Sequence, residues 1–231
     1  MYEGVHAHPD GRATVARLAK TAATYGYEGV VVRNHGDAQA EYDPERIGDR
    51  YGVDVVPGIE IRSDDPGQAS GLVGNYRSKR TIVCVHGGAL NRFAVEQPAV
   101  DVLAHPMRGG DINHVLAKTA AENGVHIEFN LGRVLRTDGG ERVKAIQGLR
   151  KLREITEQYD TPYVVSAGAR SHLQLRAPRE LRAVGEVIGF DGDAIADGLA
   201  AWGELAERNR TRNAETFVEP GVRIESHEDG G

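Results

Sequence analysis

Short apolar runs alternate with amphipathic stretches along most of the chain, most clearly between Asp101 and Asn130. In this segment an apolar run at 102–104 ends at His105, apolar residues at helical spacing follow, and residues 125–129 form a second apolar run. Asp111 is the expected N-cap of the helix, because its carboxylate can accept amide hydrogens of the first turn. This order predicts a βαβ unit with two parallel strands.

The same alternation continues on both sides of this unit. It predicts strands at 2–5, 29–33, 53–61 with an internal break at Pro57-Gly58, 81–85, 102–104, 125–129 and 163–165, and a weaker eighth strand at 187–190. It predicts helices over 15–22, 44–51, 65–76, 90–95 and 111–124, after Gly139-Gly140 with Val143 to Ile155 on its apolar face, from Pro178, and over 195–205.

Seven or eight strands that alternate with helices favour an α/β fold, specifically a compact, TIM-like (β/α) barrel whose closure need not be regular. A doubly wound open sheet is the rival, but no G-x-G-x-x-G follows any predicted strand. The linkers are short, so residues 1–212 are predicted to form one domain. The polar and acidic residues 213–231 are predicted to form a disordered tail.

Charge is unevenly distributed along this chain, whose formal net charge is −6. Residues 133–182 hold eleven Lys and Arg against six Asp and Glu, whereas residues 183–231 hold four against eleven. The basic block is a candidate for phosphate contact, and a solvated helix face is the alternative. Arginine outnumbers lysine by 23 to 5, which suggests adaptation to high salt. Bidentate arginine contacts to phosphate then matter more than diffuse charge.

The remaining composition bears on the compartment. No run of 18 apolar residues and no signal peptide is found, so we expect no membrane segment and a cytoplasmic protein. The single cysteine, Cys84, lies in an apolar run and is predicted to be a buried core residue in a reducing compartment.

Histidine and glutamate collect at the predicted strand ends. These residues are His6, His8, His35, Glu60, His86, His105, Glu128 and His172. In a barrel the carboxyl ends of the strands converge on one face, and active sites lie on that face. Imidazole and carboxylate groups are the usual ligands of zinc, iron or manganese. The pattern therefore indicates a metal site in the barrel mouth, and histidines packed there without metal are the alternative.

The motif order HAH, NHG, GIE, VHG, AHP and IEFN in residues 1–130 resembles that of PHP phosphoesterases, which are metal-dependent barrels. Two departures matter: Asn34 stands where that family has Asp, and residues 166–168 offer no Asp before the last histidine. Fewer anionic ligands weaken a cation cluster, so we expect a single-ion, partial or empty site. The resemblance implies Zn, Mn or Fe ligands at His6, His8, Glu60 and His105, with His35, His86 and His172 as further candidates.

Four longer segments are similar to the archaeal ribonuclease P protein component 3 family, and the resemblance covers nearly all of residues 1–190. They are VDVLAHP (100–106), NHVLAKTAAENGVHIEFNL (113–131), RVKAIQGLRKLREI (142–155) and SHLQLRAPREL (171–181). The family implies a PHP-like barrel in the ribonucleoprotein that removes 5′ leaders from precursor tRNA. It also implies that catalysis and Mg²⁺ belong to the ribonuclease P RNA, that the isolated chain is not catalytic, and that it pairs with component 2 among other ribonuclease P proteins.

Within the basic block, five arginines near strand ends are candidates for RNA contact: Arg133, Arg136, Arg170, Arg176 and Arg179. Guanidinium groups there can bind phosphate oxygens of a folded RNA, and we expect recognition by shape and backbone. Surface charges or intramolecular salt bridges are the alternative for each. Three functions stay open: the ribonuclease P subunit, which we prefer, a free-standing metal-dependent phosphoesterase, and a binding scaffold whose histidines only pack.

Overall fold

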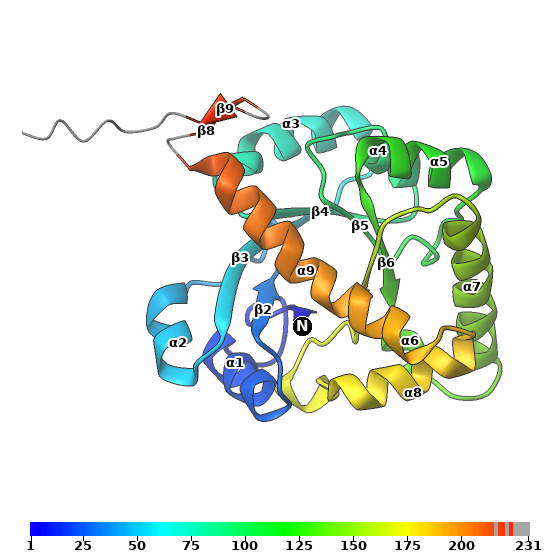
Figure 1. The fold of residues 1–231 in the computed structure, drawn as a ribbon, viewed down its shortest axis with the longest axis horizontal. Coiled ribbons are helices and arrows are strands. Elements are labelled where there is room, and N and C mark those ends of the chain that lie inside the picture. The colour runs from blue at the N-terminus through cyan, green and yellow to red at the C-terminus, as the bar shows by residue number, and fades with distance from the viewer. Residues whose placement is uncertain (215–216, 220–221, 224–231) are drawn as a thin grey trace, which may run out of the picture.

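Seven parallel strands form one curved sheet in the computed structural model, which describes residues 1–214, 217–219 and 222–223 (Figure 1). The strands lie in sequence order and each pairs with the next. They are β1 Tyr2–Val5, β2 Gly29–Val32, β3 Asp54–Ile61, β4 Ile82–His86, β5 Val102–Ala104, β6 His126–Asn130 and β7 Tyr163–Ser166. Helices surround the sheet, and the predicted TIM-like (β/α) barrel is confirmed with seven strands.

The helices are α1 Val15–Thr24, α2 Pro44–Tyr51, α3 Pro66–Arg77, α4 Asn91–Val95, α5 His114–Asn123, α6 Gly132–Arg136, α7 Gly139–Gln158, α8 Pro178–Ile188 and α9 Gly192–Asn213. Capping residues determine where several of these helices begin. The Asp43 carboxylate caps α2, for example, and Pro44 occupies the first turn of that helix. The prediction of Asp111 as the cap of α5 was wrong. Asn113 accepts the amide hydrogen of Leu116 at 3.0 Å, and Asp111 pairs with Lys151 instead.

The barrel is nearly closed, because β1 and β7 form no continuous ladder. One bridge joins Val5 to Ala169, beyond the end of β7. In the same seam the buried carboxyl group of Glu3 accepts the amide hydrogen of Ala167 at 2.9 Å. A side chain thus replaces a backbone acceptor where the two strands fail to pair. Burial raises the pKa of Glu3 to about 8, although the Ala167 amide and the charge of Arg33 oppose this shift.

Helix α9 crosses the end of the barrel at which the strands begin (Figure 1). Asn209 donates to the carbonyl of Thr81, just before β4, and Arg210 pairs with Asp54 at the start of β3. Trp202 is fully buried and its indole Nε1 donates to the Val165 carbonyl at 3.0 Å. Inward-facing strand residues, the fully buried Cys84 among them, pack with Trp202 in one cluster. Helix α9 therefore covers one end of the barrel, and the functional site is expected at the other, where the strands end.

Three predictions in the second half of the chain were wrong or incomplete. Residues 187–190 form no strand, because α8 continues to Ile188 and Gly189 ends it at φ 106°. Three apolar residues and a glycine fit a strand or a helix end equally well, so periodicity alone does not distinguish the two. Helix α6, of five residues, was not predicted. On α7 Val143 is 54% exposed, so the predicted apolar face is buried only farther along the helix, at Leu149 and Leu152.

Pro57-Gly58 does not break β3. Residues 54–57 pair with β2 and residues 58–61 pair with β4, so the proline, which has no amide hydrogen, lies where the strand changes partners.

In the predicted tail, β8 Phe217–Glu219 pairs antiparallel with β9 Val222–Arg223, and residues 215–216, 220–221 and 224–231 lie outside the described residues. Within the described part of the chain, no helix has the length and apolar character needed to cross a membrane.

Candidate functional site

Six ionisable side chains meet where the strands end, and we refer to them as the histidine centre. They are His6, Asp10, His35, Glu60, His86 and His105. Except for Asp10, which lies in the loop after β1, each belongs to the last part of a strand or to the residues just beyond it. Parallel strands bring their carboxyl ends to one edge, and the predicted gathering of histidines with Glu60 is therefore seen in the structure.

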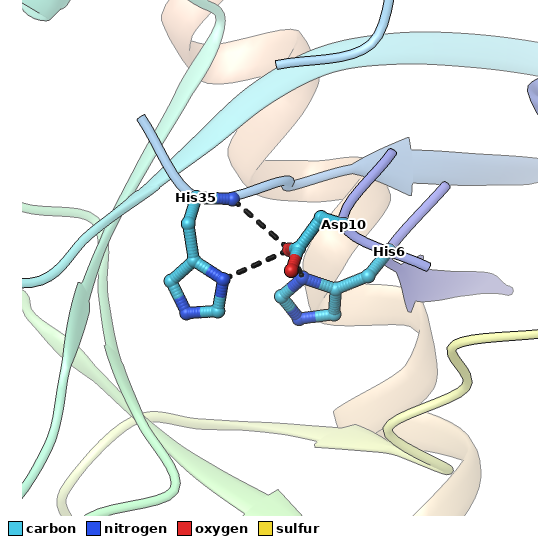
Figure 2. A group of neighbouring side chains, drawn as sticks. All are labelled: His6, Asp10 and His35. Carbon is cyan, nitrogen blue, oxygen red and sulfur yellow. Dashed lines mark hydrogen bonds and ion pairs between the residues drawn. The ribbon is translucent and has the colours of Figure 1, made fainter. Parts of the chain in front are cut away.

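Asp10 joins two histidines from neighbouring strands (Figure 2). Its Oδ2 atom lies 2.6 Å from Nδ1 of His6 and 2.8 Å from Nδ1 of His35, and it accepts the His35 amide hydrogen at 3.1 Å. Arg170 pairs with the other carboxylate oxygen. Burial alone would raise the pKa of Asp10, but hydrogen bonds from His35 and His6 outweigh it and hold the pKa far below its usual range. Asp10 therefore fixes both rings with their Nε2 atoms free to meet Glu60.

Glu60 is fully buried and collects the other imidazoles. Its Oε1 atom lies 2.8 Å from Nδ1 of His86 and 3.3 Å from Nε2 of both His35 and His105. Burial tends to raise the pKa of Glu60, but His105 and Arg33 reverse the effect and lower it well below the usual value. Burial likewise tends to lower the pKa of His35, but the hydrogen bonds that its ring donates to the carboxylates of Asp10 and Glu60 raise the pKa to about 9. The neighbouring positive charges thus favour the ionised carboxylate of Glu60.

Beneath the histidine centre lies a buried arginine. Arg33 is fully buried, and its Nη1 atom donates to Glu60 Oε2 at 3.1 Å while Nη2 donates to Glu128 Oε1. Its guanidinium carbon lies 5.5 Å from the ring centroid of Trp202. Burial would raise the pKa of Glu128, but Arg33 and His105 lower it to about 2. Arg33 therefore acts as an internal cation that neutralises the carboxylates from β3 and β6.

His105 combines a polar role with backbone strain. Its φ is 34°, in the left-handed region that a residue with a side chain rarely adopts, and its amide donates to Glu128 Oε2 at 2.8 Å. Such strain persists only where surrounding contacts fix it, and here Glu128 supplies that contact.

The spacing of the nitrogen and oxygen donors fits a small divalent cation. Nε2 of His35 is 3.4 Å from Nδ1 of His86, which is 3.0 Å from Nε2 of His105. With Glu60 Oε1 they form a compact set, and ligands of tetrahedral zinc with bonds of about 2.0 Å stand about 3.3 Å apart. The ligand atoms of His35, Glu60 and His86 all lie within 4.8 Å of one another, as do those of His6, Asp10 and His35. These residues can hold one ion between them.

The structure places two sequence candidates elsewhere. His8 is exposed in the loop after β1, and His172 starts a short 3₁₀ helix at His172–Gln174. Neither contacts the histidine centre among the described residues. Asn34, which replaces the Asp of the phosphoesterase motif, accepts the Ala7 amide hydrogen at 2.8 Å and donates to the Ala7 carbonyl at 2.7 Å. It therefore holds two loops together and does not serve as an anionic ligand.

Sequence reasoning missed Asp10 and Arg33. Asp10 lies four residues after His6, and Arg33 ends a predicted strand, but no spacing rule links either to the other strands. The available signal was Arg33 itself, since a charge beside a run of three valines is rarely buried without a partner.

A pocket of about 670 Å³ opens from the histidine centre toward α6 and α7; we refer to it as the mouth pocket. His6, His35, His86 and His105 lie in its lining, together with five basic side chains: Arg108, Arg133, Arg136, Lys144 and Arg170. Three predicted RNA-contact arginines are therefore brought together here. Arg176 and Arg179 lie outside the pocket, just before α8 and in its first turn.

Parallel strands in sequence order, with histidines and carboxylates at their carboxyl ends, place the chain in the class of TIM-like (β/α) barrels. Its fold matches a chain of an archaeal ribonuclease P with mature tRNA, determined by cryo-EM, with a TM-score of 0.83 at 24% identity over 100% of both chains. It also matches a histidinol phosphate phosphatase from Lactococcus lactis with a TM-score of 0.56 at 12% identity, over 82% of this chain and 94% of that one.

Comparison with sequence relatives identifies the family. The family described as RNase P subunit p30 matches residues 1–214. Ribonuclease P protein component 3 of Natronomonas pharaonis is 73% identical over 225 residues, covering 97% of this chain and 95% of that protein. The component 3 of Haloarcula marismortui is 62% identical over 99% of both. The chain belongs to the RNase P subunit p30 family.

Proposed function

We propose that this chain is a protein subunit of ribonuclease P that supports the RNA-catalysed removal of 5′ leaders from precursor tRNA. The family match over residues 1–214 carries the proposal, and identities of 73% and 62% over nearly the whole chain support it. Its partners are then the ribonuclease P RNA, protein component 2 and the other ribonuclease P proteins, with precursor tRNA as the substrate. The setting is the cytoplasm.

In this proposal Mg²⁺ acts through the RNA and the protein supplies no catalytic group. The histidine centre is consistent with that division of labour. Arg33 already neutralises Glu60 and Glu128, and Asp10 is held between two histidines and Arg170. Carboxylates engaged in this way are poorly placed to activate a water molecule.

The direct test is a gentle purification of the tagged full chain from its own cells, followed by RNA sequencing and a cleavage assay on precursor tRNA. We expect one structured RNA and leader-removing activity that is lost on ribonuclease treatment. An RNA-free protein that hydrolyses simple phosphoesters with added manganese would support the phosphoesterase function and contradict the proposed role as a ribonuclease P subunit.

We further propose that Arg133, Arg136, Arg170, Arg176 and Arg179 contact RNA phosphates. Arg179 is exposed and forms no ion pair within the described residues, and Arg176 donates only to the carbonyls of Leu173 and Leu175. Replacing Arg176 and Arg179 by Ala should raise the RNA dissociation constant roughly tenfold, because two phosphate contacts are lost.

Filter binding at fixed salt measures this effect, and circular dichroism checks the fold. The matched control is Arg46→Ala with Arg50→Ala on α2, where both arginines are exposed beside acidic residues. An equal effect of the two double variants would remove Arg176 and Arg179 from the RNA contacts.

A second proposal concerns a divalent cation, because the donor spacing at His35, Glu60, His86 and His105 suits one. A bound cation would add positive charge at the barrel mouth, where it attracts phosphate oxygens. After incubation with Zn²⁺ or Mn²⁺ and desalting, the chain should retain about one ion, as a single compact ligand set predicts.

Elemental analysis by mass spectrometry gives the ion content without any activity assay. His86→Ala with His105→Ala should abolish retention, whereas His8→Ala should not change it because His8 is exposed and outside the centre. Retention that is absent, or that is unaffected by the double variant, would exclude the site.

A further inference from the structure

The mouth pocket has two walls of different chemistry. Basic side chains, Arg136 and Arg108 among them, form one part of its lining. The other part is largely apolar and consists of Pro106, Met107, Ala145, Gly148 and Leu149. A pocket that pairs cations with an apolar surface suits a ligand with one anionic and one flat apolar end.

The charges in the pocket are not balanced from within. Five basic residues line it against one carboxylate, Glu128, which Arg33 already neutralises. Arg170 pairs with Asp10, and Glu141 pairs with both Arg133 and Lys144.

Two guanidinium groups of the mouth pocket have no carboxylate partner among the described residues. Arg136 donates through Nη2 to the carbonyls of Ala167 and Gly168, both at 2.9 Å, but forms no ion pair within the part of the chain that the structure describes. The exposed Arg108 likewise forms no ion pair within the described residues. Burial and the nearby Arg176 lower the pKa of Arg136, as expected for a cation that lacks an anionic partner, although Glu3 opposes the shift. Neither arginine is neutralised by a carboxylate of the described residues, so both are available to an anionic group of another molecule.

The size of the pocket restricts that molecule. A volume of about 670 Å³ is typical of sites for small ligands, which span roughly 300–1,000 Å³. An RNA duplex cannot enter such a space, whereas an unpaired nucleotide turned out of its strand can, and its base can then lie on an apolar wall.

We propose that the mouth pocket binds one unpaired ribonucleotide, with its phosphate at Arg136 and Arg108 and its base against Met107 and Leu149. This inference rests on the proposed function, because the nucleotide belongs to an RNA strand of the assembled ribonucleoprotein. Both the ribonuclease P RNA and precursor tRNA offer that chemistry, and sequencing of the bound RNA distinguishes them.

Met107 allows a direct experiment, because the chain has only two methionines and the other is Met1. The full chain is prepared with a photoreactive methionine, assembled with its RNA and protein partners, irradiated, and the cross-linked RNA positions are sequenced. Cross-links are expected at one or two unpaired nucleotides and should be absent when Met107→Leu removes the internal probe.

A steric variant tests the pocket itself. Gly148 is a helical residue of α7, and a Cβ atom built on it stands 3.8 Å from Met107 Cε. Gly148→Leu should therefore fill the pocket and reduce the cross-link at least about tenfold by excluding the base. Gly71→Leu on α3, where a Cβ meets nothing within 4 Å, is the matched control and should leave the cross-link unchanged.

The outcomes separate this inference from the proposed function. If the chain assembles with RNA and cleaves precursor tRNA but Met107 cross-links only to protein or to paired RNA, the nucleotide pocket is overturned and the subunit function stands. An undiminished cross-link in Gly148→Leu also overturns it. If no RNA assembles with the chain, the proposed function itself fails.

Discussion

Replacing Arg33 by Met should strongly destabilise the folded protein. The variant leaves Glu60 and Glu128 fully buried without the cation that neutralises both. Breaking a buried ion pair by removing one partner costs about 3–5 kcal/mol. For a chain of this size that corresponds to a fall in Tm of roughly 10 °C, measured by thermal unfolding at constant salt.

Further variants identify the cause of that loss. Arg33→Lys keeps one charge but cannot bridge both carboxylates, so it should give an intermediate loss. Adding Glu128→Gln to Arg33→Met should recover part of the stability, because one unpaired charge is removed. Arg46→Met, at an exposed position of α2, is the matched control. A change in Tm for Arg33→Met no larger than that of the control would show that the ion pairs contribute little.

Ionisation of Glu3 should destabilise the folded protein progressively as pH rises from about 4.5 to 8, so Glu3→Gln should gain stability relative to the natural chain over this range. The carboxyl group of Glu3 has its pKa raised from 4.5 to about 8 by burial in the seam between β1 and β7. Between these values the unfolded chain releases the proton and the folded chain keeps it. The free energy of unfolding therefore decreases by roughly 1.4 kcal/mol per pH unit from this group.

The sign follows from the folded state favouring the protonated acid. Below pH 4.5 both states hold the proton, and above pH 8 both release it, so the contribution changes only inside this window. Glutamine is neutral throughout, and its carbonyl oxygen can still accept the Ala167 amide hydrogen. Glu3→Gln should therefore be more stable than the natural chain at pH 8 by several kcal/mol, and by little at pH 4.5.

Urea unfolding across this pH range measures the difference between the two curves. Glu45→Gln on α2 serves as the control, since Glu45 is exposed. Parallel curves for the natural chain and Glu3→Gln would mean that Glu3 is ionised in the folded protein at neutral pH.

The elements of the fold were largely predictable because their signals are local. Helix α2 begins at Pro44 and ends at Tyr51 as predicted, since the proline at its start and Gly52 after its end act within a few residues. The predicted strand at 187–190 failed for a complementary reason. The buried Phe190 packs on Phe129 with ring centroids 4.9 Å apart, and this tertiary contact, not a strand, explains the apolar residue.

The candidate site was predictable as a set of strand ends but not as a set of contacts. Alternation of strands and helices implies that His35, Glu60 and His86 face one mouth, whichever side chains pair there. It does not say that Asp10 reaches two histidines while His8, two residues earlier, stays exposed. That choice depends on the path of a loop, which no period in the sequence encodes.

The sequence by itself determined the barrel, the end at which its histidines gather and the family to which it belongs. All three follow from the order of residues along the chain and from parallel pairing of neighbouring strands. Only the tertiary structure decided how the charges balance. Arg33 neutralises acids from β3 and β6, 27 and 95 residues away, and Arg136 is left without an ion pair among the described residues. Coulomb interactions depend on distance in space, and folding alone sets those distances.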